Sequence, residues 1–268
     1  MKFFCKKPGP KSLAVIKRDR KIISPSLTRS FDFVFESAKG CYVYDMDGRR
    51  YLDFSAAVAV ANVGHTNPEV VRAVSKQAKK VMHTAFSDYY TELPVRFSEL
   101  LVTFLPKHLN CVFLSNSGTE SVEAMFKLAR WHSNKKWTIA FKNAFHGRTM
   151  GSLSMTNSKP VQRERFSPFL PVKHATFAYP YRASLDCSQD CLDELEKIMK
   201  SVRGDIASVI MEPIQGEGGY IVPPKEFVKG VKNLCDEYGA LFCVDEVQSG
   251  CYRTGKFLAI ENFGVKPD

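Results

Sequence analysis

The stretch "FVKGVKNLCDEYGALFCVDEVQSG", residues 227–250, contains one helix, one strand and two acidic residues in immediate succession. Residues 226–238 read as a helix, and Gly239 is a plausible C-cap because glycine adopts left-handed backbone angles without steric cost. The apolar run that begins at Leu241 predicts a short buried strand. Asp245 and Glu246 stand at its carboxyl end, so a buried strand is followed directly by two charged side chains.

The same alternation of strand and helix extends over the chain from residue 111. The predicted strands lie near "CVFLS" at 111, "TIAF" at 138, "HATFAY" at 174, "IASVIM" at 206 and "LFCVD" at 241, and another helix is expected over 119–130. This order predicts an α/β fold with a mostly parallel central sheet and helices on both faces. Ligands of such sheets bind at the carboxyl ends of the strands.

The N-terminal part has a different pattern. Residues 42–54, "YVYDMDGRRYLDF", predict a β-hairpin with its turn at Asp47-Gly48. Asn67-Pro68 predicts a helix start, and a second helix is expected to carry residues 93–104. We therefore expect a small α+β part before the parallel sheet.

Composition narrows the class of protein. The 268 residues are 44% hydrophobic and 25% charged, which is ordinary for a globular protein. The apolar runs are too short to span a bilayer, and the basic N-terminal segment lacks the apolar core of a signal peptide, so we expect a cytoplasmic protein without membrane contact. The net charge of +10 is scattered, which argues against a nucleic-acid partner.

The eight cysteines form no C-x-x-C pair, so no metal site is predicted. We expect reduced and mostly buried thiols. The cysteines are Cys5, Cys41, Cys111, Cys187, Cys191, Cys235, Cys243 and Cys251.

The residues that follow the strand near 111 can hold a phosphate. In "SNSGTESVEA", Gly118 permits close backbone approach and Thr119 offers a hydroxyl at a helix start, where free amides attract anions. An ordinary capping box of Ser117 with Glu120 explains the same residues equally well.

The other strand ends offer complementary groups. "FHGR" places aromatic Phe145 and His146 beside Arg148, whose guanidinium suits a carboxylate. "EPIQGEGG" adds two acids, Glu212 and Glu217, and Asp245 needs a cationic partner if it is buried. Separately these are a packed aromatic, a solvated arginine and turn acids. Together they fit a planar, phosphorylated, N-protonated cofactor, as pyridoxal 5'-phosphate is.

The chain resembles the class III (omega-type) aminotransferases, such as the 4-aminobutyrate, ornithine and acetylornithine enzymes. The resemblance rests on several segments in the family's order: "DMDGRRYLDFSA", "GHTNPEVV", "SNSGTESVEA", "FHGRT", "EPIQGEGG" and "DEVQSGCYRTG". It implies the pyridoxal-phosphate-dependent transferase fold of type I. It also implies transfer of an amino group from an amino acid or omega-amino acid to a 2-oxo acid.

The resemblance also implies roles for individual residues. The cofactor-binding residues would be Gly118, Thr119, Phe145, His146, Asp245, Val247 and Gln248. The catalytic residues would be Asp245, Glu217 and Glu212, and Arg148 would bind the substrate carboxylate.

Four of these roles are specific. Asp245 would keep the pyridinium nitrogen protonated, and Phe145 would stack on the ring. Glu217 would be the switch acid that lets one site accept two substrates, with Glu212 close by in support.

The resemblance extends to domains and partners. Residues 1–62 would join a small domain and 63–268 the large cofactor domain. The partners would be a small-molecule amino donor, a 2-oxo acid acceptor and a second subunit that completes an interfacial active site.

One family residue is expected to be absent from this chain. The Schiff-base lysine of the family follows the pyridinium aspartate by roughly thirty residues, whereas Asp268 follows Asp245 by only 23. Lys256 and Lys266 do not match its position. We therefore predict that residues 1–268 alone are inactive and that the C-terminal part of the fold is missing. A racemase or decarboxylase on the same scaffold, or a non-catalytic fragment or half of a split enzyme, remain alternatives.

Overall fold

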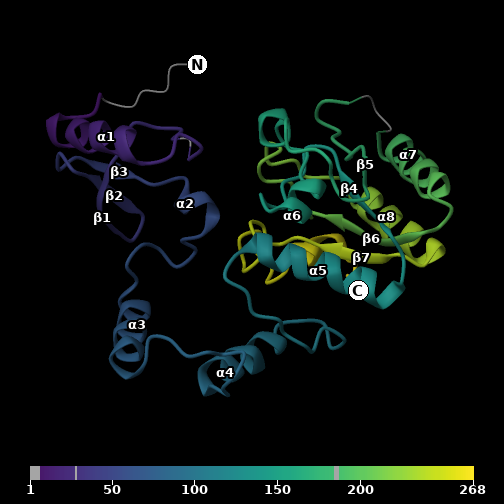
Figure 1. Cartoon of the computed structure of the whole chain (residues 1–268), viewed down its shortest axis with the longest axis horizontal. Coiled ribbons are helices and arrows are strands. Elements are labelled where there is room, and N and C mark those ends of the chain that lie inside the picture. Colours follow the sequence, from purple (N-terminus) through teal and green to yellow (C-terminus); the bar gives the residue numbers. More distant parts are fainter. Residues whose placement is uncertain (1–6, 28, 184–186) are drawn as a thin grey trace. The chain divides into compact units, whose positions relative to one another are not determined.

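The computed structural model describes residues 7–27, 29–183 and 187–268 (Figure 1). Cys5 and the start of the basic N-terminal segment lie outside the described residues. The chain divides into two compact units, Met1–Tyr90 and Thr91–Asp268. The predicted boundary between a small domain and the cofactor domain, after residue 62, is a different division and stays a prediction. Within the described residues, no helix has the length and apolar character needed to cross a membrane.

The first unit contains α1 (Pro10–Ile22) and a three-stranded antiparallel sheet of order β1 (Phe35–Lys39), β2 (Tyr42–Asp45), β3 (Arg50–Leu52). The predicted hairpin is therefore confirmed as β2–β3. A single left-handed turn, α2 (Ala56–Ala59), follows, and then α3 (Pro68–Lys80). The Asn67 side chain accepts the amides of Glu69 and Val70, which confirms the predicted helix start.

The second unit begins with α4 (Glu92–Val102) and is built on four parallel strands (Figure 1). Their order is β5 (Val172–Ala175), β4 (Trp137–Phe141), β6 (Ile206–Met211), β7 (Leu241–Val244). Two short 3-10 helices, η1 (Pro160–Gln162) and η2 (Ala259–Phe263), lie in loops. The strand expected at 174–179 is shorter and starts two residues earlier.

Helices cover both faces of this sheet, as predicted. On one face α5 (Gly118–Ser133) and α6 (Met150–Met155) contact β4 and β6. On the other, α7 (Cys187–Ser201) and α8 (Lys225–Tyr238) contact β5, β6 and β7. Phe141, Phe177 and Phe227 form the centre of the larger core, with ring centroids 5.5–5.8 Å apart in edge-to-face contacts. Gly239 ends α8 at φ 58°, which confirms the predicted cap.

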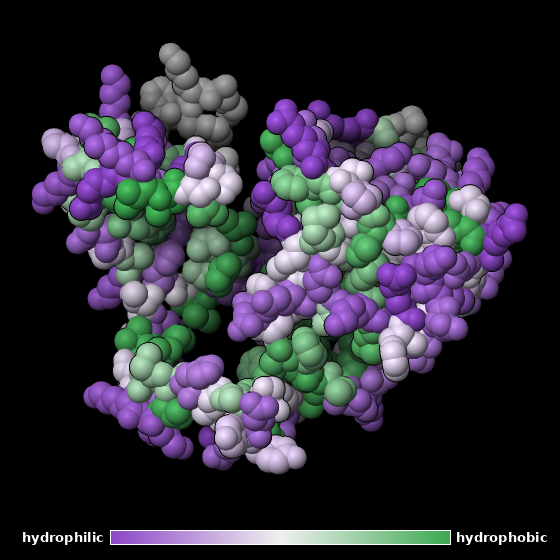
Figure 2. All heavy atoms as spheres, viewed as in Figure 1, coloured by the Kyte–Doolittle hydropathy of each residue, from purple (hydrophilic) through white to green (hydrophobic). Residues whose placement is uncertain are grey.

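The strand expected near residue 111 is not formed. Residues 111–115 have no strand partner among the described residues, and Phe113 is 73% exposed. A strand needs a neighbour for its backbone groups. On the outer side of β7, the backbone of Phe242 instead bonds to Asp268, accepting its amide at 3.0 Å. Figure 2 shows hydrophobic residues gathered at the surface around α4 and the segment that leads to α5.

The cysteines depart in part from expectation. The seven described ones are free, and Cys187, Cys191 and Cys235 are buried. Cys41, Cys111 and Cys251 are exposed, so the prediction of buried thiols is wrong for these three. None of the three lies in a helix or strand of the core.

Candidate functional site

The site lies where β4, β6 and β7 end at the carboxyl edge of the parallel sheet. Asp245 follows β7, Glu212 follows β6, and the loop from 142 to 149 follows β4. The amino end of α5 reaches the same place, since a Cβ on Gly147 would overlap the Thr119 hydroxyl oxygen. Parallel pairing therefore collects residues from four distant parts of the sequence.

Asp245 and His146 form a buried pair at the centre of the site. His146 Nδ1 lies 2.8 Å from Asp245 Oδ2, and the two side chains are 0% and 6% exposed. The amide of Val247 donates to Asp245 Oδ1 at 3.1 Å, and the amide of His146 donates to the Thr156 hydroxyl at 2.9 Å. The carboxylate is thus fixed in position by these two contacts. His146 Nε2 is buried without a hydrogen-bond partner among the described residues.

Glu212 joins two loops of the site. Its Oε1 accepts the amide of Phe145 at 2.8 Å, and its Oε2 accepts the amide of Gly216 at 2.9 Å. Burial raises the pKa of this carboxyl above its usual value, while His146 and the two amides act in the opposite direction. Glu212 therefore ties the loop after β4 to the glycine-rich loop after β6. Its predicted role in support of Glu217 stays a prediction.

A hydroxyl cluster surrounds the start of α5. Thr119 Oγ1 lies 2.9 Å from the hydroxyl of Thr149 and 2.5 Å from that of Ser152. Glu123 accepts the Thr149 hydroxyl at 2.6 Å and the Gly151 amide at 2.8 Å, so it caps α6. Sequence reasoning missed Glu123, although its position four residues after Thr119 places it on the same face of the helix.

The start of α5, where a phosphate is predicted to bind, contacts Val247. A Cβ on Gly118 would lie 2.9 Å and 3.1 Å from the two methyl carbons of Val247, so only glycine allows this approach. The Ser117 hydroxyl accepts the amide of Glu120 at 3.4 Å, while the Glu120 carboxylate accepts the amide of Asn116. Only half of the alternative capping box is present, because the acid reaches back one residue further than Ser117.

The glycine-rich loop after β6 adjoins the loop after β7. A Cβ on Gly216 would overlap the side chain of Gln248, so these two positions are in contact. Glu217 Oε2 forms an ion pair with Lys159 Nζ at 2.8 Å, a partner that the sequence did not suggest. Arg148 is exposed and has no ion pair with a described residue. Its predicted contact with a carboxylate stays a prediction, as do the other individual roles.

Comparisons with protein families, with curated proteins and with solved structures all match aminotransferases. The family described as "Aminotransferase class-III" matches residues 23–268. An acetylornithine aminotransferase of Methanosarcina mazei is 41% identical over 255 residues, which are 95% of this chain and 60% of that protein. A probable 4-aminobutyrate aminotransferase of Bacillus subtilis is 37% identical, covering 94% of this chain and 60% of the relative.

A solved structure shows the same fold. Taurine:2-oxoglutarate aminotransferase from Bifidobacterium kashiwanohense, in complex with PLP and glutamate, superposes with a TM-score of 0.89 at 29% identity. The match covers 97% of this chain and 61% of that one. The predicted fold class is confirmed, and the chain spans about 60% of the length of the relatives it matches.

Proposed function

This chain belongs to the class-III aminotransferases, and we propose that its sheet edge holds pyridoxal phosphate for amino-group transfer. The amino donor would be an amino acid or omega-amino acid of the 4-aminobutyrate, ornithine or acetylornithine type, and the acceptor a 2-oxo acid. The observation that carries the proposal is the buried Asp245–His146 pair at 2.8 Å, beside a helix start with a hydroxyl cluster.

The residues present fit this cofactor. Asp245 supplies a buried carboxylate in a fixed orientation, which favours a protonated ring nitrogen. Gly118 lets the first turn of α5 pack closely against Val247, where a Cβ would clash, and Thr119 adds a hydroxyl at the positive end of α5. Phe145, held by Glu212 through its amide, would provide the stacking surface, and we assign it that role.

When bound, pyridoxal phosphate supplies an electron sink for cleavage of a bond at the substrate carbon that bears the amine. Asp245 would keep the proton on the ring nitrogen of the bound cofactor, and its contact with His146 would hold Asp245 in place. Val247 and Gln248 would contact the ring, and Arg148 would orient the substrate through its carboxylate. Glu217 would be the switch acid that lets the site accept two differently charged substrates.

Assembly of the whole protein is part of the proposal. We infer a cytoplasmic homodimer with an interfacial site, or completion by a separately encoded C-terminal half. The exposed apolar residues of α4 and of the following segment support a partner surface; they include Leu93, Phe97, Leu100, Phe104 and Phe113. We keep the assignment of residues 1–62 to a small domain and 63–268 to the cofactor domain.

The decisive experiment measures binding of pyridoxamine 5'-phosphate to residues 1–268 by calorimetry, because this form carries no aldehyde to react with surface lysines. Asp245→Asn should weaken binding about 10- to 100-fold, the equivalent of a lost charge-assisted hydrogen bond. Asp190→Asn, at an exposed acid, is the control. Equal affinity of the wild type and Asp245→Asn would contradict the proposed site.

Turnover is tested separately. We expect no transamination by residues 1–268 alone, since Lys256 and Lys266 do not occupy the position that the family implies for the reactive lysine. Robust transamination by this polypeptide would refute that expectation. In the full-length protein, product formation from one enantiomer without a 2-oxo acid would indicate racemisation instead.

A further inference from the structure

The centre of the loop after β4 is held by hydrogen bonds from its backbone to other parts of the second unit. This segment carries both Phe145 and His146. The carbonyl of Ala144 accepts the amide of Asn157 at 2.7 Å, and the amide of Phe145 donates to Glu212 at 2.8 Å. The loop is therefore tied to its surroundings one residue after another.

Thr156 makes the next two of these contacts with a single hydroxyl group. Its oxygen accepts the amide of His146 at 2.9 Å, and its proton is donated to the carbonyl of Gly147 at 2.9 Å. A hydroxyl has one proton, so both of its functions are used here. The side chain of Thr156 is 0% exposed, so water does not compete for either contact.

The position of Thr156 is set by a buried helix. Thr156 is the C-cap of α6, and its amide bonds to the carbonyl of Ser152 at 3.0 Å. Residues 151–155 are all buried, and Glu123 from α5 accepts amides at the amino end of α6. A buried helix with partners at both ends opens less readily than a loop, so the Thr156 hydroxyl is a fixed point against which the loop is placed.

Placement of the loop backbone decides where the His146 side chain points. Side chains occupy a few staggered rotamers relative to their own backbone, so a shift of the backbone moves the imidazole with it. His146 Nδ1 lies 2.8 Å from Asp245 Oδ2, and a shift of about 1 Å would break this hydrogen bond. The peptide group whose amide Thr156 accepts also joins His146 to Phe145, so both side chains depend on this contact.

We propose that Thr156 is a positioning residue of the cofactor site: its hydroxyl fixes the loop that presents His146 to Asp245 and Phe145 to the cofactor ring. The effect on the ring rests on the proposed function, whereas the hold on the loop does not. Without the hydroxyl, two buried backbone groups lose their partners, and the loop must open toward water to satisfy them.

The test compares two buried threonines by calorimetry with pyridoxamine 5'-phosphate. Thr156→Val has nearly the same shape but no hydroxyl, and it should weaken binding about 10-fold, whereas Thr156→Ser should stay within about three-fold of the wild type. Thr138→Val is the matched control, because Thr138 is also 0% exposed and its hydroxyl lies 2.9 Å from that of Ser208, near the start of β4. It should lower stability in urea, as Thr156→Val does, and leave the affinity unchanged.

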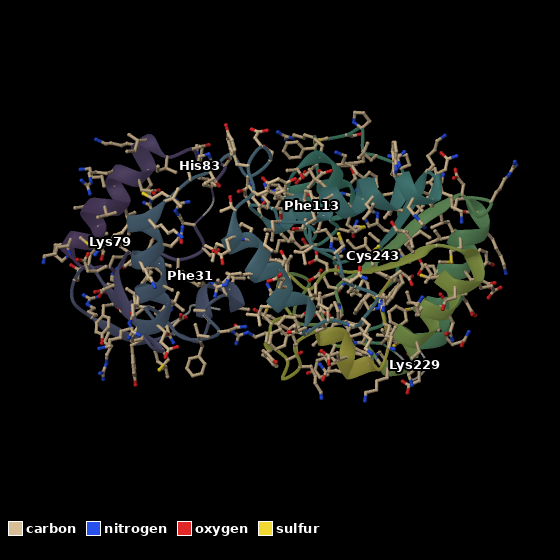
Figure 3. All side chains as sticks on the ribbon, turned by 90° about the horizontal axis from the view of Figure 1, so that it is seen from below. Phe31, Lys79, His83, Phe113, Lys229 and Cys243 are labelled. Carbon is tan, nitrogen blue, oxygen red and sulfur yellow. The ribbon has the colours of Figure 1, made fainter. Side chains whose placement is uncertain are left out.

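These outcomes separate positioning from stability. A threonine that only stabilised the fold would behave like Thr138. Wild-type affinity in Thr156→Val, an equal loss of affinity in Thr138→Val, or a serine variant no better than the valine variant would each overturn the proposal. Lys229→Met, at an exposed lysine on α8, is the surface control for both measurements (Figure 3).

Backbone hydrogen exchange tests the hold on the loop without any cofactor. In the wild type the His146 amide should exchange at least about 100-fold more slowly than in an unstructured peptide. In Thr156→Val its exchange rate should rise about 10-fold more than that of the Ile139 amide in β4, because the loop opens locally. An unprotected His146 amide in the wild type would overturn the proposal even where Thr156→Val does not fold.

The two measurements keep this inference apart from the proposed function. If the wild type does not bind pyridoxamine 5'-phosphate, the proposed function falls, and hydrogen exchange decides whether Thr156 holds the loop. If it binds, and Asp245→Asn weakens binding while Thr156→Val does not, only the role of Thr156 falls.

Discussion

The close approach of Gly118 to Val247 makes one substitution especially informative. A Cβ at position 118 would lie 2.9 Å from one methyl carbon of Val247 and 3.1 Å from the other. Optimal separation between carbon atoms is about 3.5–4.0 Å, so the two residues would have to part by roughly 0.5–1 Å. Rotating Val247 gives little relief, because both of its methyl groups already face the glycine and its χ1 angle is restricted.

Gly118→Ala should therefore destabilise the second unit by about 1–3 kcal/mol through overpacking, partly offset by the ~0.5–1 kcal/mol that alanine gains over glycine in a helix. In a Val247→Ala background both methyl groups are absent, and the overpacking cost should disappear. A double-mutant cycle should thus give a coupling energy of about 1–2 kcal/mol.

The measurement is urea unfolding of the four proteins of the cycle. Val161→Ala is the matched control, because Val161 and Val247 are both 71% exposed. It should be additive with Gly118→Ala. Additivity of Gly118→Ala and Val247→Ala within about 0.5 kcal/mol would refute the contact, and with it the narrow cradle on which the phosphate assignment rests.

Two further predictions concern a half-buried histidine and a buried carboxyl group. Burial, with Arg163 nearby, lowers the pKa of His174 from 6.5 to about 4, so the folded state gives up a proton that the unfolded state keeps, and stability should fall by up to about 3 kcal/mol as the pH drops from 6.5 to 4. Urea unfolding at pH 7 and pH 4.5 checks this, and a pH dependence that is unchanged in His174→Gln would contradict it. Glu212→Gln should cost about 1–3 kcal/mol, because an amide side chain cannot accept both backbone amides that the carboxylate accepts now. Exposed Glu226→Gln is its control in thermal unfolding, and equal melting temperatures would show that the two amides find other partners.

Local chemistry determined many elements of this fold. Asn67 and Pro68 start α3 because the asparagine side chain satisfies amides that the first turn leaves free. Gly239 ends α8 because it adopts a φ of 58°. The apolar runs at 138 and 206 form strands that are buried on both faces of the parallel sheet, and the run at 241 forms β7, in which Phe242 is buried. For the start of α3 and the end of α8, the deciding contacts lie within a few residues of the element.

The failed strand at 111–115 marks the limit of such reasoning. Its residues have strand propensity, yet Phe113 is 73% exposed and no described segment pairs with it. Propensity cannot supply the neighbouring backbone that a strand requires. The sequence likewise did not specify that β4 lies between β5 and β6.

The candidate site divides in the same way. Sequence alone placed Asp245, His146, Glu212 and Glu217 at strand ends, where charge and aromatic groups suggest a ligand. Only the tertiary structure decided that Asp245 meets His146 across 99 residues of sequence, and that Glu217 meets Lys159. Strand order sets which loops become neighbours, and the loops in turn set the side-chain partners of buried or half-buried charges. Neither the strand order nor these partners can be inferred from residue spacing along the chain.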